Sequence, residues 1–186
     1  MRVRPRVTRL LQPIGKALAA IGITPAAMTS IGLAVVIAGS VVISREYLKS
    51  GAVIVLVGAA LDGLDGSIAR ASNKVSARGA FLDSAFDRIG EIAAFAGLAV
   101  AFASDERVLL LVVVAIGGAM LVPYMRARAE AEGLDGRGGL MGRAERIILF
   151  CLGLLLGYVE AMLVIFVVLV WLTATMRFFH TYRSLE

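Results

Sequence analysis

The chain has 186 residues, of which 59% are hydrophobic, and its mean hydropathy is +0.87. A soluble domain of this length is far less apolar, so the composition indicates an integral membrane protein. One cysteine, Cys151, and one histidine, His180, exclude a disulfide framework or a Cys/His zinc site within one chain. The net charge of +5 does not indicate nucleic-acid binding, because the basic residues lie at the ends of apolar runs, where they mark membrane topology.

The first 22 residues are basic and only partly apolar. Pro13, Gly15 and Lys16 lie where a secretory signal would have its apolar region, and no clear cleavage site follows. We therefore expect residues 1–22 to form a juxtamembrane amphipathic helix on the membrane surface.

Six apolar runs follow, most of them about as long as the 20 residues that a helix needs to cross a bilayer. Pro25 begins the first run directly after Thr24, a common arrangement at a helix N-terminus. We expect an all-α integral membrane protein, in which a bundle of six transmembrane helices over residues 25–183 completes a single domain of residues 1–186. The expected spans are 25–47, 50–72, 79–103, 105–128, 144–158 and 160–183.

The basic residues divide the loops between these spans into two sides. One side has only Arg45, Lys49 and Arg107. By the positive-inside rule the other side is cytoplasmic, so we expect both termini in the cytoplasm of a multi-pass cell-membrane protein, as six spans require. That side carries the N-terminal arginines, Lys16, Arg70, Lys74, Arg78, Arg126, Arg128, Arg137, Arg143, Arg146, Arg177 and Arg183.

Four aspartates lie inside the apolar sequence. Asp62 and Asp65 are spaced i,i+3 near the end of the second expected span, and Asp83 and Asp87 are spaced i,i+4 near the start of the third. On helices, each spacing places both carboxylates on one face. Because the second span runs toward the cytoplasm and the third runs back, the two pairs are expected at similar shallow depth, around one site open to that side.

A cation is needed to make these carboxylates tolerable in a membrane. One aspartate at the centre of a membrane helix costs roughly 2.5–3.5 kcal/mol, so four cost on the order of 10–14 kcal/mol if depth is ignored. The flanking Arg70, Arg78 and Arg88 are too few to neutralise four acids. The four aspartates therefore predict one or two divalent metal ions, with two as the expected number, and oxygen ligands favour Mg²⁺ or Mn²⁺.

A shallow carboxylate site of this kind suits a substrate with one end in lipid and a phosphate at the surface. Bound metal ions would neutralise and orient a pyrophosphate and stabilise its leaving group. Asp87, the deepest of the acids on the third span, is the candidate base for an attacking hydroxyl.

Arginines at three other span ends form a second candidate site. Arg126 and Arg128 end the fourth span, Arg143 and Arg146 begin the fifth, and Arg177 lies near the end of the sixth. The arginine fork matches phosphate oxygens. One such arginine would more simply mark topology, but the set beside an acidic site predicts a pocket for a second, phosphorylated, water-soluble substrate.

The stretch from Asp62 to Asp87 reads DGxDGxxAR…GxxxDxxxD. This pattern resembles the signature of the CDP-alcohol phosphotransferases, membrane enzymes of phospholipid synthesis, and the resemblance extends over most of the chain. It implies six spans, a preceding surface helix and a homodimer. It also implies that the four aspartates bind the metal ions, with Asp87 as the base. The residues implied to hold the CDP part of the lipid substrate are Thr29, Gly66, Arg70 and Ser76.

Three shorter stretches, LDSAFDR (82–88), YMRARAE (124–130) and RAER (143–146), resemble the actinobacterial phosphatidylinositol-phosphate synthases within that family. This resemblance implies transfer of a phosphatidyl group from CDP-diacylglycerol to inositol phosphate, with release of CMP. It also implies that Arg126, Arg146 and Arg177 contact the acceptor phosphate, with Arg143 nearby.

Two other functions stay open. One is a phosphatidylglycerophosphate synthase, or another member of the family with a different acceptor alcohol. The other belongs to a different class, a divalent-cation transporter, because acids inside membranes also line ion paths. The clustering of the acids at one depth, instead of a relay across the bilayer, favours the enzyme.

Overall fold

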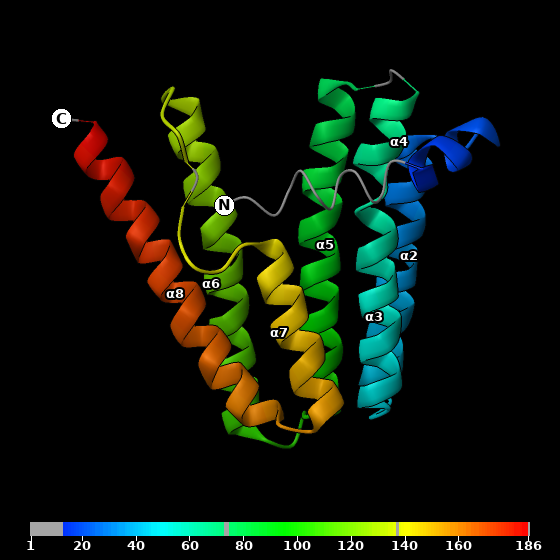
Figure 1. Cartoon of the computed structure of the whole chain (residues 1–186). Helices are drawn as coiled ribbons and strands as arrows, with labels where there is room; N and C mark the ends of the chain where they lie inside the picture. Colours follow the sequence, from blue (N-terminus) through cyan, green and yellow to red (C-terminus); the bar gives the residue numbers. More distant parts are fainter. Residues whose placement is uncertain (1–12, 73–74, 137, 186) are drawn as a thin grey trace.

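The computed structural model describes residues 13–72, 75–136 and 138–185, and all regular structure within them is helical (Figure 1). Residues 13–20 form a helical segment at the end of the expected surface helix, whose residues 1–12 lie outside the described part. The helices that follow are α2 (Pro25–Ser44), α3 (Leu48–Asp62), α4 (Asp65–Ala71), α5 (Ala77–Ala101), α6 (Glu106–Ala131), α7 (Arg143–Leu156) and α8 (Val159–Ser184).

Side-chain caps explain where several of these helices begin. The Thr24 hydroxyl accepts a hydrogen bond from the Ala27 amide at 3.1 Å, with Pro25 in the first turn. Asp105 accepts from two amides at the start of α6. Gly157, with φ of +79°, ends α7 in the left-handed conformation that glycine adopts without strain.

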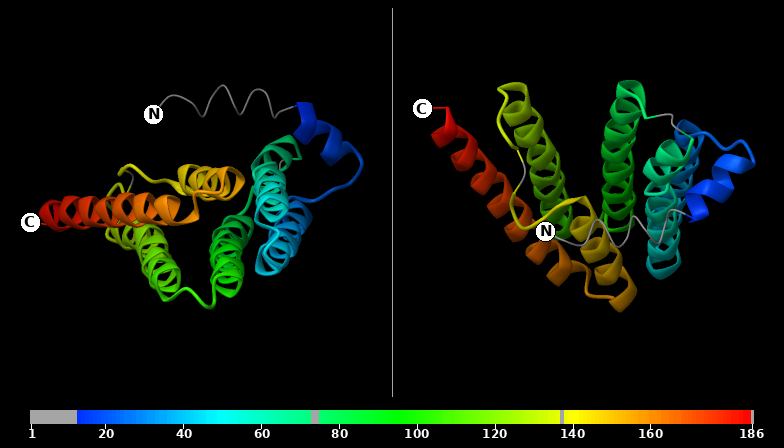
Figure 2. Two further views of the ribbon diagram at one scale, coloured as in Figure 1. Left: turned by 90° about the horizontal axis from the view of Figure 1, so that it is seen from below. Right: turned by 45° about the horizontal axis from the view of Figure 1, so that its top comes forward.

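The helices form two groups that diverge toward one end of the molecule (Figures 1 and 2). Helix α2 packs against α3 and α5 on one side, and α6 packs against α8 on the other. Helix α7 lies between the groups and contacts both α3 and α8. Phe95, Phe150 and Phe166, from α5, α7 and α8, join the groups by edge-to-face contacts with ring centroids 5.0 Å apart.

Four segments are long and apolar enough to cross a membrane: α2, residues Leu48–Ala71 (α3 with α4), α6 and α8. The chain is therefore an all-helical, multi-pass membrane protein. The other two expected spans correspond to α5 and α7. Helix α5 has the length but carries the charged residues of the site, and α7 has 14 residues, roughly 21 Å, against a hydrocarbon core of about 30 Å.

The second expected span is present as Leu48–Ala71, and a step in its hydrogen-bond pattern divides it into α3 and α4. Helix α3 ends at Asp62, and α4 begins at Asp65. Between them the Leu64 amide donates to the Leu61 carbonyl at 3.0 Å, an i→i−3 bond of 3₁₀ type. Glycines at 63 and 66 weaken the helix here, so the two aspartates belong to different segments.

Glycines bring α2 and α3 into backbone contact. A Cβ atom on Gly32 would lie 2.8 Å from the Asp62 Cβ and 2.9 Å from the Gly58 carbonyl oxygen. Gly39 and Gly51 form an equivalent pair further along the same helices. Small residues at both positions let helices approach closely in a membrane. The end of α3, with Asp62, is therefore held directly against α2.

Candidate active site

Three carboxylates converge where α3 ends and α5 begins. Asp62 is 5% exposed at the end of α3, and Asp83 and Asp87 lie one turn apart on α5. One oxygen of each lies within 4.8 Å of the others. The convergence of the two motif halves, which the spacing predicted, is present in these three residues.

Asp65, the first residue of α4, is outside this group of three. Its Oδ2 lies 3.2 Å from the hydroxyl of Thr29, and its Oδ1 accepts a hydrogen bond from the Gly66 amide. Thr29 is buried, and its one hydroxyl proton can go either to Asp65 or to the Pro25 carbonyl at 3.0 Å. Thr29 thus lies beside the carboxylates and contacts one of them.

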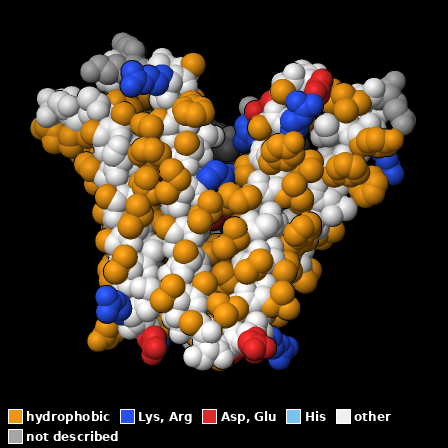
Figure 3. Space-filling view, turned by 180° about the vertical axis from the view of Figure 1, so that it is seen from behind, with side chains coloured by type: hydrophobic (Ala, Val, Ile, Leu, Met, Phe, Trp, Pro, Cys, Tyr) orange, Lys and Arg blue, Asp and Glu red, His pale blue; other side chains and the backbone are white. Residues whose placement is uncertain are grey.

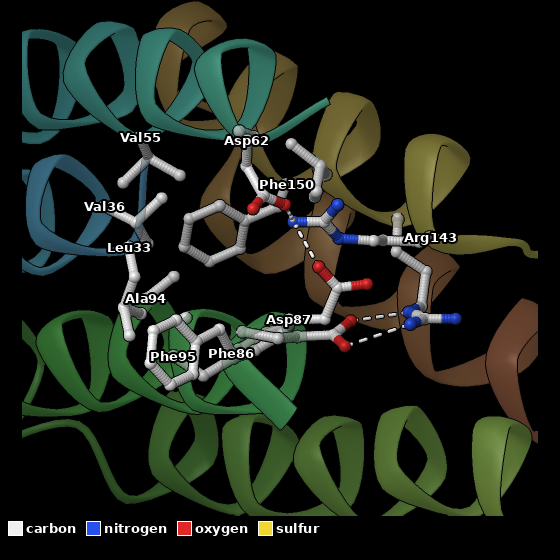
Figure 4. A pocket seen from close by; sticks show the side chains of 15 residues that line it. Leu33, Val36, Val55, Asp62, Phe86, Asp87, Ala94, Phe95, Arg143 and Phe150 are labelled. Carbon is white, nitrogen blue, oxygen red and sulfur yellow. Dashed lines mark hydrogen bonds and ion pairs between the residues drawn. The ribbon is translucent and has the colours of Figure 1, made fainter. Parts of the chain in front are cut away.

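Arg143, the first residue of α7, reaches into the carboxylate cluster (Figure 4). Its Nη2 lies 2.6 Å from Asp62 Oδ2 and 2.7 Å from Asp87 Oδ1. Both oxygens are buried and lie against the same guanidinium nitrogen. Arg143 therefore bridges two carboxylates from different helices.

The donor set fits a divalent metal ion. Buried carboxylates need cationic partners, and Mg²⁺ and Mn²⁺ are cations that bind carboxylate oxygens. The nearby oxygens of Asp62, Asp83 and Asp87 can supply that coordination from one side.

Arg146, one turn further along α7, is bound elsewhere. It is 2% exposed, and its Nε and Nη2 bind the two carboxylate oxygens of Glu91 on α5, with Nη2–Oε2 at 2.9 Å. Its Nη1 donates to the Met141 carbonyl at 3.3 Å. No sequence pattern predicts this pair, because 55 residues separate its members.

The other two predicted acceptor residues lie around the loop before α7. Arg126 pairs with Glu130 at 2.8 Å on α6. Arg177 on α8 donates to the Gly138 carbonyl at 3.0 Å and to the Val122 carbonyl at 2.8 Å. The predicted arginine set is therefore divided. Arg143 and Arg146 contact carboxylates, whereas Arg126 and Arg177 lie beside the loop that joins α6 to α7.

The predicted CDP contacts beyond Thr29 lie on α4 and at the start of α5, near the carboxylates. The exposed Arg70 donates to the Ser67 hydroxyl at 3.3 Å and lies next to Gly66. Ser76 caps α5 by accepting from the Gly79 amide at 3.1 Å. Helix α4 and the start of α5 lie at the end of the bundle toward which the two helix groups diverge (Figure 1).

A cavity of about 40 Å³ lies below the carboxylates, enough for a few water molecules. Its polar end is formed by Asp62, Asp87, Glu91 and the two arginines of α7, and its other walls are apolar (Figure 4). The space-filling view shows the surface hollowed between the two helix groups, with basic side chains inside (Figure 3). Helix α7 begins partway along the bundle (Figure 1), and its arginines contact the acids of α3 and α5.

Comparison with known proteins places this geometry in a family. The family model of the CDP-alcohol phosphatidyltransferases matches residues 22–179. The archaetidylinositol phosphate synthase of Pyrococcus horikoshii is 35% identical over 186 residues, which cover 100% of this chain and 97% of the relative.

Two solved structures are also similar. The phosphatidylinositol phosphate synthase of Mycobacterium tuberculosis with CDP-DAG bound has a TM-score of 0.86 and 29% identity, over 94% of both chains. The same enzyme in complex with manganese and citrate also has a TM-score of 0.86, with 28% identity over 92% of this chain and 88% of the other.

Proposed function

This chain belongs to the CDP-alcohol phosphatidyltransferase family, and we propose that it transfers a phosphatidyl group from CDP-diacylglycerol to inositol phosphate, giving phosphatidylinositol phosphate and CMP. The observation that carries the proposal is the convergence of Asp62, Asp83 and Asp87 beside arginines of α7, in a hollow between two groups of membrane helices. A lipid nucleotide and a soluble phosphate can both reach such a site.

The names of the similar proteins support the choice of acceptor. The relative from Pyrococcus and the structures from Mycobacterium share inositol phosphate in the names of their products and differ in the lipid part. An inositol phosphate acceptor therefore agrees with both. Glycerol 3-phosphate, the acceptor of a phosphatidylglycerophosphate synthase, is the alternative that the experiment below distinguishes.

In the proposed reaction, Asp87 takes the proton of the attacking hydroxyl. The hydroxyl oxygen forms a bond to the lipid-side phosphorus, the phosphorus–oxygen bond to CMP breaks, and CMP leaves with the electron pair. Bound Mg²⁺ or Mn²⁺, two ions in our proposal, would be held by Asp62, Asp65, Asp83 and Asp87 and would supply neutralising charge for the diphosphate.

The remaining predicted residues receive substrate-binding roles in this proposal. Thr29, Gly66, Arg70 and Ser76 hold the CDP moiety beside the carboxylates. Arg126, Arg143, Arg146 and Arg177 contact the acceptor phosphate. Of these, Arg143 contacts the proposed base Asp87, and Arg146 contacts Glu91 one turn further along α5.

We propose the membrane arrangement that the sequence predicts. Helices α5 and α7 complete six spans, a surface helix precedes them, and residues 1–186 form one domain. Both termini and the open end of the site face the cytoplasm, since that end carries most of the basic residues. We also propose that the protein is a homodimer in the cell membrane.

An assay of CMP release tests the function. The full-length protein is given CDP-diacylglycerol with inositol phosphate, glycerol 3-phosphate, free inositol or serine, in EDTA and then with Mg²⁺ or Mn²⁺. We expect CMP only with inositol phosphate, none in EDTA, and recovery on adding metal. Release with glycerol 3-phosphate alone would replace the acceptor, and metal uptake into vesicles without nucleotide would favour the transporter.

A further inference from the structure

We propose that Arg143 is a built-in counter-ion of the carboxylate cluster: it neutralises Asp62 and Asp87 while no divalent cation is bound, and an entering cation displaces it toward the open side of the site. This inference rests on the proposed function, because the cation is the one used in the proposed reaction. It gives Arg143 a role at the metal site that precedes any contact with the acceptor phosphate.

The two arginines of α7 bind carboxylates in different ways. Arg146 holds Glu91 through two nitrogens and two oxygens, the fork arrangement that guanidinium and carboxylate prefer. Arg143 shares one nitrogen between two oxygens of different residues. The geometry of Arg146 is that of a permanent pair, whereas Arg143 makes only a single-nitrogen contact with each carboxylate.

The two arginines of α7 also differ in how much of each side chain is exposed. The side chain of Arg143 is 30% exposed, whereas that of Arg146 is 3% exposed. The carboxylates that Arg143 contacts are buried, at 7% and 11%. Arg143 can therefore leave the cluster by rotating its side chain toward the opening, but Asp62 and Asp87 cannot follow it.

A metal ion and Arg143 compete for the same oxygens. The oxygens that Arg143 contacts, Asp62 Oδ2 and Asp87 Oδ1, are buried, and both residues belong to the group that can hold a metal. A divalent ion carries twice the charge of a guanidinium and repels it at this distance. Once displaced, the guanidinium lies at the mouth of the site, where a phosphate needs a cationic partner.

The experiment compares Mn²⁺ binding by the wild type, Arg143→Gln and Arg88→Gln, as full-length proteins in detergent, by the electron paramagnetic resonance signal of free Mn²⁺. Arg88 is the matched control, because it is also an arginine paired with Asp87 but through the other oxygen, Oδ2, at 3.2 Å. We expect Arg143→Gln to bind Mn²⁺ at least about tenfold more tightly than the wild type, and Arg88→Gln to change the affinity about threefold at most.

Thermal unfolding provides a second readout that does not depend on activity. In EDTA, Arg143→Gln is expected to unfold at a lower temperature than the wild type, because two buried carboxylates lose their counter-ion. In saturating Mn²⁺ the two proteins are expected to unfold at the same temperature. A variant that is destabilised equally in both conditions would show a purely structural role and overturn the inference.

The outcomes distinguish this inference from the proposed function. Unchanged or weaker Mn²⁺ binding by Arg143→Gln, with metal-dependent CMP release intact in the wild type, rejects the inference alone. A wild type that neither binds Mn²⁺ nor needs metal for CMP release rejects both. If Arg143→Gln cannot be purified in EDTA, Arg143→Lys, with a shorter cationic side chain, is measured instead. Tighter Mn²⁺ binding by Arg143→Lys than by the wild type supports the inference. Equal or weaker binding rejects it.

Discussion

Glu91 on α5 holds Arg146 on α7 through both of its carboxylate oxygens, and both side chains are less than 10% exposed. The pair joins the helix that carries Asp83 and Asp87 to the helix that carries Arg143. Breaking a buried pair from one side leaves an uncompensated charge, which typically costs about 3–5 kcal/mol.

We therefore predict that Glu91→Gln lowers the free energy of unfolding by about 3 kcal/mol or more, as measured by thermal or denaturant unfolding in detergent. The double variant Glu91→Gln with Arg146→Gln removes both charges and is expected to be more stable than Glu91→Gln alone. A double variant whose loss equals the sum of the two single losses would show that the residues do not interact.

Asp87→Asn is predicted to lower CMP release by a factor of about 10² or more, because the amide cannot accept the hydroxyl proton. Asp105→Asn is the matched control, since Asp105 caps α6 at the end of the helix where α5 and α6 are joined, away from the cluster. The control should keep its activity, because Asn caps a helix about as well as Asp. Full activity of Asp87→Asn would remove Asp87 from the role of base.

Thr173 on α8 fixes the loop that leads into α7. Its buried hydroxyl accepts hydrogen bonds from the Leu140 and Met141 amides at 3.2 and 3.0 Å, and it donates to the Leu169 carbonyl at 2.8 Å. Thr173→Val keeps the shape but leaves two amides without this acceptor, so we expect a loss of about 1–3 kcal/mol in stability.

The same change is predicted to raise the KM for inositol phosphate more than the KM for CDP-diacylglycerol, because the loop precedes the arginines of α7. Thr173→Ser retains the hydroxyl and should restore both properties. If steady-state kinetics show equal changes in both KM values, the loop does not position the acceptor site.

Gly32→Ala is predicted to destabilise the protein and reduce CMP release. The added Cβ would lie 2.8 Å from the Asp62 Cβ and 2.9 Å from the Gly58 carbonyl, so α3 and its aspartate must move. Gly117→Ala is the control in another membrane helix, where the nearest atom, in Trp171, would be 3.7 Å away. Alanine normally favours a helix over glycine by about 1 kcal/mol, so the control should be as stable as the wild type or more stable.

The sequence determined the features that depend on local composition and short spacings. Apolar runs located the helices, and four of the six expected spans are confirmed as segments able to cross a membrane. The i,i+4 spacing placed Asp83 and Asp87 on one face of α5, and the motif identified the family that the comparisons confirm. These features could be predicted because hydropathy and helix periodicity act within a few turns of the chain.

Only the tertiary structure decided how distant parts of the chain meet. Asp62, Asp83 and Asp87 form one group, while Asp65 contacts the Thr29 hydroxyl and the Gly66 amide. The loop before α7 packs against α6 and α8, Arg143 at the start of α7 contacts Asp62 and Asp87, and the Glu91–Arg146 pair fixes the next turn. No local pattern encodes these contacts, because they arise from the close glycine packing of α2 against α3 and from the way buried charges must find partners once the helices are packed.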